Sequence, residues 1–290
     1  MSFTVHGTAI VAEGADIGQD VFIGPYCVVG QNVKIGKGTK LHSHVIIDGY
    51  TSLGEYNELF PFASIGTVPQ DLKFKGEPST LTIGDRNKIR EYVTIQPGTE
   101  HGGMKTVVGS SNLFMANCHI GHDSSVGSSN VFANSVAIAG HVRVENNIIF
   151  GGLSAVHQFC RIGSLSLVAG GAMVNLDVPP FCLVQGDRAS LRGLNLIGLQ
   201  RAGFSPEDIS CLKRVYRHLF FAVGHFRKKL ETIPNDLIEN ERVKALLDFI
   251  NGSSRGITEP LRSSNDMSIV ESFEPSSKTA VPGEVSLENS

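Results

Sequence analysis

The sequence predicts a mainly β protein: a parallel β-helix of hexapeptide repeats followed by a small α-helical C-terminal domain. Three observations predict it. An apolar residue returns at every sixth position over long runs, and the next residue is often glycine. Beyond Pro180, the spacing of apolar residues changes to that of helices. A six-residue period is typical of a parallel β-helix, in which each hexad forms one short strand and one turn.

The repeat occurs in three runs in the sequence. The first run has eleven positions: Val5, Val11, Ile17, Ile23, Val29, Ile35, Leu41, Ile47, Leu53, Leu59 and Ile65. The others are Ile83, Ile89 and Ile95, and then Val108, Phe114, Ile120, Val126, Phe132, Ile138, Val144, Phe150, Val156, Ile162, Val168 and Val174. Because three hexads close one coil, these positions predict about nine coils. We expect the apolar side chains to point inward and the small residue beside each to let the chain bend.

Two segments interrupt the period. In the first, the in-phase positions are the charged residues Asp71 and Glu77, and the second breaks the phase with a spacing of 13 residues. Three hexads in each coil make the β-helix a triangular prism. We predict that both segments leave this prism as loops, at about residues 67–82 and 96–107. Loops on a rigid scaffold are where functional residues concentrate.

The repeat ends near Pro179 and Pro180, because proline cannot continue a strand ladder. We therefore predict a β-helix over residues 1–180 and an α-helical domain over residues 181–256. A tail rich in Ser, Glu and Pro, residues 257–290, is predicted to be disordered.

Helix signals follow the prism. Ser205 and Pro206, with two acidic residues after them, offer an N-cap, a proline at the first helical position and a favourable first turn. Apolar residues then follow at helical spacing, and a second helical stretch is predicted over residues 234–250.

Composition excludes several classes of protein. The net charge of −3 gives no basic field for nucleic acid, and no apolar run is long enough to span a membrane. The N-terminus lacks the pattern of a secretory signal, and five scattered cysteines without a C-x-x-C pair match neither a disulfide framework nor a zinc ribbon. We expect a cytoplasmic protein that binds no nucleic acid and is not an integral membrane protein.

Histidines gather in one window of the repeat. Four of the ten are His119, His122, His141 and His157. Gly140 follows His122 by 18 residues, so it should lie directly one coil above. A histidine base and a backbone N–H that stabilises an oxyanion are what hydroxyl acylation needs.

Two other interpretations use the same region. Asp123 would orient His122 only if the chain bends there, because neighbouring residues on a strand point to opposite faces. His119, His122 and His141 would alternatively suit a three-histidine zinc site, as in the gamma-type carbonic anhydrases. In a third interpretation, besides acyl transfer and zinc binding, the histidines are ordinary polar residues on the outer face of a prism that serves only as an assembly subunit.

Several segments resemble the UDP-N-acetylglucosamine O-acyltransferase family. They are QDLKFKGEPSTLTIGDRNKIREYVTI (70–95), ANCHIGHDSSVG (116–127), AGHV (139–142), AVHQFCRIG (155–163) and RGLNLIGLQRAGFS (192–205). The resemblance covers about residues 5–256. It implies transfer of a 3-hydroxyacyl chain from acyl carrier protein to the 3-hydroxyl of UDP-N-acetylglucosamine, in lipid A biosynthesis, with no cofactor or metal. Hexapeptide proteins of this kind coil left-handed.

The resemblance also implies roles for single residues. His122 matches the family's general base, Asp123 its acidic neighbour, and Gly140 the glycine whose amide faces the carbonyl oxygen. Residues that match substrate-binding positions are Gln70, Asp71, Lys73, His119, His141, His157, Gln158, Asn195 and Arg201. Two departures stand at Ile197 and Ala202, where some relatives carry a glutamate and a second arginine, so nucleotide contacts are expected to be weaker or rearranged.

The resemblance implies partners and a chain-length determinant. Family members are homotrimers, and an acidic carrier protein suits a basic rim expected near Lys73, Lys75, Arg86, Lys88 and Arg90. Gly170 holds the same hexad position as His122, 48 residues later, and therefore lies on another face and about 13 Å along the axis. Glycine leaves an acyl groove open there, which predicts preference for a long 3-hydroxyacyl chain. The substrate is either UDP-N-acetylglucosamine or its 3-amino analogue.

The nearest rival enzyme is the N-acyltransferase of the same pathway, also a hexapeptide prism. It carries a domain before the repeats. Here the repeat starts at Val5, which leaves no room for one.

Overall fold

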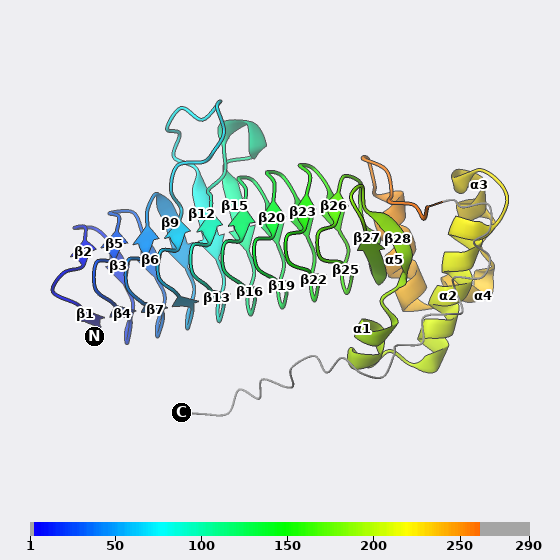
Figure 1. Ribbon diagram of the computed structural model, residues 1–290, viewed down its shortest axis with the longest axis horizontal. Helices are drawn as coiled ribbons and strands as arrows, with labels where there is room; N and C mark the ends of the chain where they lie inside the picture. The colour runs from blue at the N-terminus through cyan, green and yellow to red at the C-terminus, as the bar shows by residue number, and fades with distance from the viewer. Residues whose placement is uncertain (1–2, 262–290) are drawn as a thin grey trace. The chain divides into compact units, whose positions relative to one another are not determined.

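The computed structural model describes residues 3–261, which form a mainly β, left-handed parallel β-helix followed by a small helical region (Figure 1). The fold class predicted from the repeat is confirmed. Its three sheets contain eleven, nine and eight strands, and are called here A, B and C.

Sheet A contains β1 (Thr4–Val5), β4 (Phe22–Ile23), β7 (Lys40–Leu41), β10 (Glu58–Leu59), β13 (Lys88–Ile89), β16 (Leu113–Phe114), β19 (Val131–Phe132), β22 (Ile149–Phe150), β25 (Leu167–Val168), β27 (Cys182–Gln185) and β28 (Ser190–Leu194). Sheet B contains β2 (Ile10–Val11), β5 (Val28–Val29), β8 (Ile46–Ile47), β11 (Ser64–Ile65), β14 (Thr94–Ile95), β17 (His119–Ile120), β20 (Ala137–Ile138), β23 (Ala155–Val156) and β26 (Met173–Val174). Sheet C contains β3 (Asp16–Ile17), β6 (Lys34–Ile35), β9 (Tyr50–Leu53), β12 (Thr80–Ile83), β15 (Lys105–Val108), β18 (Ser125–Val126), β21 (Arg143–Val144) and β24 (Arg161–Ile162).

The repeat positions fill the interior of the prism. From Ile23 to Val174 they are buried, and Phe114, Phe132 and Phe150 stack at 4.7 and 4.8 Å between ring centroids. Val5 is an exception to the predicted pattern, with 38% of its surface exposed, because the first coil has no coil beneath it.

The corners are built differently from our expectation. Apart from Gly66 (φ 74°), where the first loop begins, the glycine after an aliphatic residue does not make the bend. A Cβ on Gly24 would lie 2.5 Å from the His42 carbonyl oxygen, so glycine is needed there for close approach of the next coil. The left-handed backbone conformation falls two residues later, at positions such as Tyr26 (φ 58°) and His44 (φ 58°).

A ladder of buried asparagines follows the corner between sheets C and A, at Asn57, Asn87, Asn112 and Asn130. The Asn57 Oδ1 accepts from the Asn87 backbone N–H at 2.9 Å and from its Nδ2 at 3.0 Å. Asn87 and Asn112 repeat the same pair of bonds at the same two distances. The ladder satisfies buried polar groups on both sides of each interruption.

Both interruptions leave the prism between sheets B and C (Figure 1). The first runs from β11 to β12, and the second from β14 to β15, with a 3₁₀ turn, η1 (Glu100–Gly102). The loops contact each other, since the Glu77 carboxylate accepts from the Glu100 N–H at 2.9 Å.

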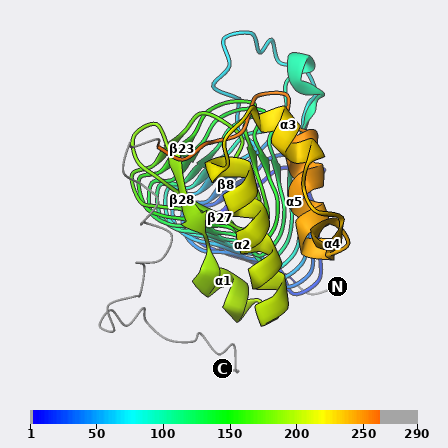
Figure 2. The same cartoon turned by 90° about the vertical axis from the view of Figure 1, so that its right-hand side faces the viewer.

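Strands continue beyond the expected end of the prism. β27 pairs with β25 in parallel, and β28 returns antiparallel to β27. The helices are α1 (Leu196–Arg201), α2 (Pro206–Phe221), α3 (Phe226–Glu231), α4 (Asn235–Ile238) and α5 (Glu241–Asn251). α2 and α5 pack against each other (Figure 2). None of the helices in the described part of the chain is both long and apolar enough to cross a membrane.

The helix signals are confirmed at α2, where the Ser205 hydroxyl accepts from the Asp208 N–H at 3.0 Å and the Asp208 carboxylate accepts from the Ser205 N–H. The second predicted stretch is divided, because Asn240 caps a new helix. The predicted tail begins too early: Ile257 forms a bridge with Asp177, and Thr258 is buried. Residues 262–290 of that tail lie outside the described residues.

Candidate active site

The candidate site lies at the corner between sheets B and C, where residues follow β17, β20 and β23. Strand pairing aligns His119 with Ala137 and Ala137 with Ala155, so each coil repeats after 18 residues. Gly140 therefore lies one coil above His122, as the sequence predicts, and Gln158 lies one coil above Gly140.

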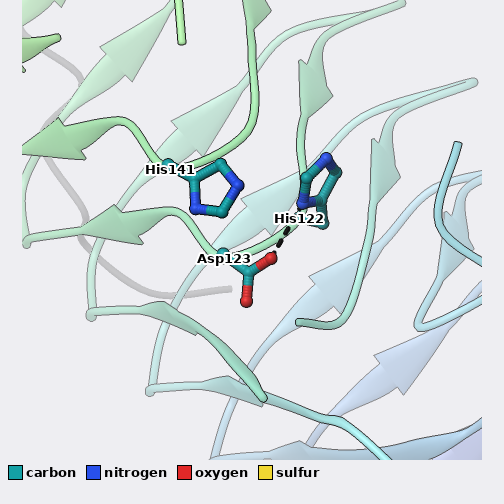
Figure 3. A group of neighbouring side chains, drawn as sticks. All are labelled: His122, Asp123 and His141. Atoms are coloured by element: carbon teal, nitrogen blue, oxygen red, sulfur yellow. Dashed lines mark hydrogen bonds and ion pairs between the residues drawn. The ribbon is translucent and has the colours of Figure 1, made fainter. Parts of the chain in front are cut away.

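His122 and Asp123 form a hydrogen-bonded pair (Figure 3). The His122 Nδ1 and the Asp123 Oδ2 are 2.8 Å apart. The bend that this pairing requires is present, because Asp123 has a left-handed backbone (φ 59°). Since a carboxylate only accepts, Nδ1 carries a proton, and in the neutral ring the lone pair is on Nε2. The pair therefore leaves Nε2 as the basic atom.

Thr99, in the second loop, holds Asp123 from the other side. Its hydroxyl donates to the Asp123 Oδ2 at 2.6 Å and its N–H to Oδ1 at 2.9 Å. The Asp123 side chain is fully buried, whereas 17% of the His122 side chain is exposed. Thr99 is a site residue that sequence reasoning missed, since nothing in the loop's sequence shows where the loop returns.

Gly140 lies against the His122 ring. A Cβ on Gly140 would lie 2.8 Å from both Cε1 and Nε2 of His122, so this position has room only for hydrogen. Within residues 3–261, no acceptor bonds the Gly140 N–H. Among the described residues, the N–H groups of His122 and Gln158, which hold the same corner position one coil below and one coil above, also have no acceptor. Gly140 differs from these two residues in having no side chain.

His141 completes the group around His122. The two rings meet edge to face with centroids 5.0 Å apart, and His141 stacks on Phe159 at 4.6 Å. Burial lowers the pKa of His141 below its usual value, an effect that the nearby Asp123 charge opposes. His141 is therefore mainly neutral at pH 7.

His119 belongs to a different arrangement. Its Nδ1 lies 2.7 Å from the Thr94 hydroxyl, and burial, with the neighbouring His122, lowers its pKa. Of the described residues, the group with metal-ligand spacing is His122, Asp123 and His141, whose ligand atoms lie within 4.8 Å of one another. It differs from the three-histidine set considered from the sequence, and its carboxylate already binds Thr99.

The first loop brings two of its expected residues to this corner. Asp71 and Lys73 lie close enough to act on His141: the carboxylate raises its pKa and the ammonium lowers it, though burial outweighs both. The Asp71 Oδ1 also accepts from the Lys73 N–H at 3.0 Å. Gln70 is exposed on the same loop.

Other expected site residues lie elsewhere. Asn195 is buried and caps α1, with its Oδ1 accepting from the Gly198 N–H and its Nδ2 donating to the Leu165 carbonyl. Arg201 is exposed at the end of α1, next to Ala202, and Ile197 lies on the same helix. The side chain of Asn195 is thus already engaged within the fold.

Gly170 follows β25 at the corner between sheets A and B, a different corner from that of His122. The five residues of the expected basic rim are also divided: Lys73 and Lys75 lie on the first loop, whereas the other three flank or belong to β13 of sheet A. Arg90 there is paired with Glu91. The five residues therefore lie on two different elements, and the basic rim stays a prediction.

Two family models match the chain. Residues 14–49 match the bacterial transferase hexapeptide model of six repeats, and residues 177–258 match domain 2 of UDP-N-acetylglucosamine O-acyltransferase. The acyl-(acyl-carrier-protein)–UDP-N-acetylglucosamine O-acyltransferase of Aliarcobacter butzleri is 48% identical over 87% of this chain and 97% of its own length. The enzyme of that name from Myxococcus xanthus is 47% identical over 88% and 98%.

Solved structures agree with the sequence relatives. UDP-N-acetylglucosamine O-acyltransferase from Moraxella catarrhalis superimposes with a TM-score of 0.85 at 44% identity, over 88% of this chain and 99% of its own. Similarity of this extent covers the prism and the helical region together. The chain is an acyltransferase and belongs to the UDP-N-acetylglucosamine O-acyltransferase family.

Proposed function

We propose that the protein transfers a 3-hydroxyacyl chain from acyl carrier protein to the 3-hydroxyl of UDP-N-acetylglucosamine, in lipid A biosynthesis. The names of the relatives supply the two substrates. The observation that carries the mechanism is the His122 ring, which is tied through Nδ1 to a buried carboxylate and lies against the backbone of Gly140.

In the proposed reaction, the His122 Nε2 takes the proton of the sugar 3-hydroxyl. The hydroxyl oxygen attacks the thioester carbonyl carbon, and the Gly140 N–H stabilises the resulting oxyanion. The intermediate then collapses, the C–S bond breaks, and the proton on Nε2 passes to the departing thiolate. Asp123 fixes the tautomer of His122 and stabilises its charged form.

The proposal extends to substrate binding and assembly. Lys73 and Asp71 approach His141 from the first loop, where an ammonium suits a phosphate or an acidic carrier. The proposal places the acyl groove between subunits of a homotrimer, because Gly170 and His122 lie on different corners of one chain. A cytoplasmic location is part of the proposal and rests on the resemblance alone.

The test is an acyl-transfer assay with UDP-N-acetylglucosamine and several acyl-carrier-protein thioesters, on the wild type and on His122→Ala. We expect His122→Ala to lose about 10²-fold or more in turnover while its thermal midpoint stays close to that of the wild type. His225→Ala is the matched control, since His225 is exposed and its side chain makes no cap bond. Near-normal turnover in His122→Ala would remove His122 as the base.

A parallel measurement addresses the zinc alternative. Metal analysis of the purified protein, with a carbon dioxide hydration assay, tests the group of His122, Asp123 and His141. Stoichiometric zinc together with hydration activity would assign a zinc site to this group, whereas zinc-free protein that transfers acyl chains would dismiss it.

A further inference from the structure

The segment after α5, residues 252–260, runs back against the last coils of the prism and is called here the C-terminal strap. Buried Asp177 anchors it: its N–H donates to the Gly256 carbonyl at 2.9 Å, its carbonyl accepts from the Thr258 N–H at 2.8 Å, and its Oδ2 accepts from the Ser253 hydroxyl at 2.8 Å. The strap is thus fixed on both sides of Arg255.

Arg255 reaches from the strap to the corner that holds the candidate site. Its Nε donates to the Asn175 carbonyl at 2.8 Å, and its Nη2 lies 2.8 Å from the His157 Nδ1. Two residues 98 positions apart in the chain therefore meet at the surface of the prism.

This contact selects one form of the His157 ring. Guanidinium only donates, so Nδ1 must accept, and the neutral ring then carries its proton on Nε2. The Gln158 carbonyl, 3.2 Å from the same Nδ1, would require the opposite form, because a carbonyl only accepts. Arg255 makes the shorter contact and decides between them.

We propose that Arg255 is a positioning residue of the acyl-transfer site, which keeps His157 as the Nε2–H form so that this N–H donates to an acceptor oxygen of the bound substrate. The inference rests on the proposed function. His157 lies two coils beyond Gly121, the residue before His122, so its N–H is about 10 Å along the corner from the base. At that distance the His157 Nε2–H contacts a part of the substrate that does not react, so the contact contributes to substrate affinity and not to the chemical step.

Kinetics of Arg255→Met and Arg255→Lys test the proposal. We expect Arg255→Met to raise one substrate's KM by about 3- to 10-fold, the worth of one hydrogen bond, with little change in kcat. Arg255→Lys should recover part of the loss, since an ammonium also only donates. Arg217→Met is the matched control, because Arg217 is exposed on α2.

A double-mutant cycle separates positioning from direct contact. In a His157→Phe background, Arg255→Met should cost nothing further. Additive losses would mean that Arg255 binds substrate on its own, which would overturn the proposal.

A second readout is independent of activity. Ring ¹⁵N shifts of histidine-labelled protein, with His157 assigned from the His157→Phe spectrum, report the tautomer directly. We expect the Nε2–H form in the wild type and a shift toward Nδ1–H in Arg255→Met. An unchanged tautomer in Arg255→Met overturns the inference, whereas a wild type without acyl transfer but with the expected spectra would overturn only the proposed function.

Discussion

Replacing Gly140 by alanine tests the closest contact in the site. The added Cβ would lie 2.8 Å from Cε1 and Nε2 of His122, so the ring must retreat by about 0.6–1.2 Å to reach the ordinary van der Waals range of 3.4–4 Å. Asp123, which is fully buried and held by Thr99, resists that movement. The His122 Nε2 is therefore displaced from the position in which it would take the proton of the sugar hydroxyl. The added methyl group also occupies the space beside the Gly140 N–H.

We expect Gly140→Ala to lower kcat by about 10- to 10²-fold, because misplacing a catalytic group by about 1 Å costs about 10²-fold. Folding should change little. The backbone of Gly140 is not left-handed, and alanine reduces the entropy of the unfolded chain, which offsets part of the strain by about 0.4–1 kcal/mol.

The assay is steady-state acyl transfer together with a thermal melt. Gly7→Ala is the matched control, since a Cβ there meets nothing within 4 Å. In a His122→Ala background, the part of the Gly140→Ala effect that acts through the ring should disappear. A kcat within twofold of the wild type would refute the assigned position of the base.

Three other predictions concern Thr99, His119 and Gly170. Thr99→Val should lower kcat by several-fold, as it removes a short hydroxyl bond to a buried carboxylate, and exposed Thr82→Val is its control; equal activity of both variants would dismiss the role of the hydroxyl. Burial lowers the pKa of His119 in the folded protein, so the unfolded chain binds a proton at this residue more readily. The contribution of neutral His119 to the free energy of unfolding is therefore complete above about pH 6.5, the unfolded-state pKa, and is lost as the pH falls through the folded-state pKa. Urea titrations at pH 7 and pH 5 should show that loss, reduced in His119→Gln, and an identical pH dependence in both proteins would contradict it. Gly170→Met should shift the preferred substrate from long acyl chains to ten-carbon ones, because the methionine side chain would block the predicted acyl groove. The variant should fold, since a Cβ at this position meets only Gly152, at 3.4 Å and beyond. An unchanged ranking of chain lengths in a folded variant would mean that Gly170 serves only the corner turn.

Features fixed by the hexad count could be predicted from the sequence. Once 18 residues make a coil, the position of Gly140 over His122 follows, and the structure shows it. The partially exposed Val5 departs from the count because interior burial needs a coil on both sides.

Contacts made by segments outside the six-residue repeat could not be predicted. The hold of Thr99 on Asp123 depends on the path of a loop without a repeat, and that of Arg255 on His157 depends on a strap 98 residues away in sequence. β27 and β28 follow two prolines, and the proline signal for the end of a ladder outweighed their short apolar pattern.

The asparagine ladder has a consequence for how such a protein can change. Leu59 pairs with Ile89 across the first loop and Ile89 with Phe114 across the second, separations of 30 and 25 residues. The second is not a multiple of six, yet Asn57, Asn87 and Asn112 keep the same bonds through both. The coils on both sides of each loop are thus matched by side-chain amides, although 30 residues separate one pair and 25 the other. The register of the coils is then independent of the length of either loop, so these segments can lengthen or shorten while the strands of the prism stay aligned.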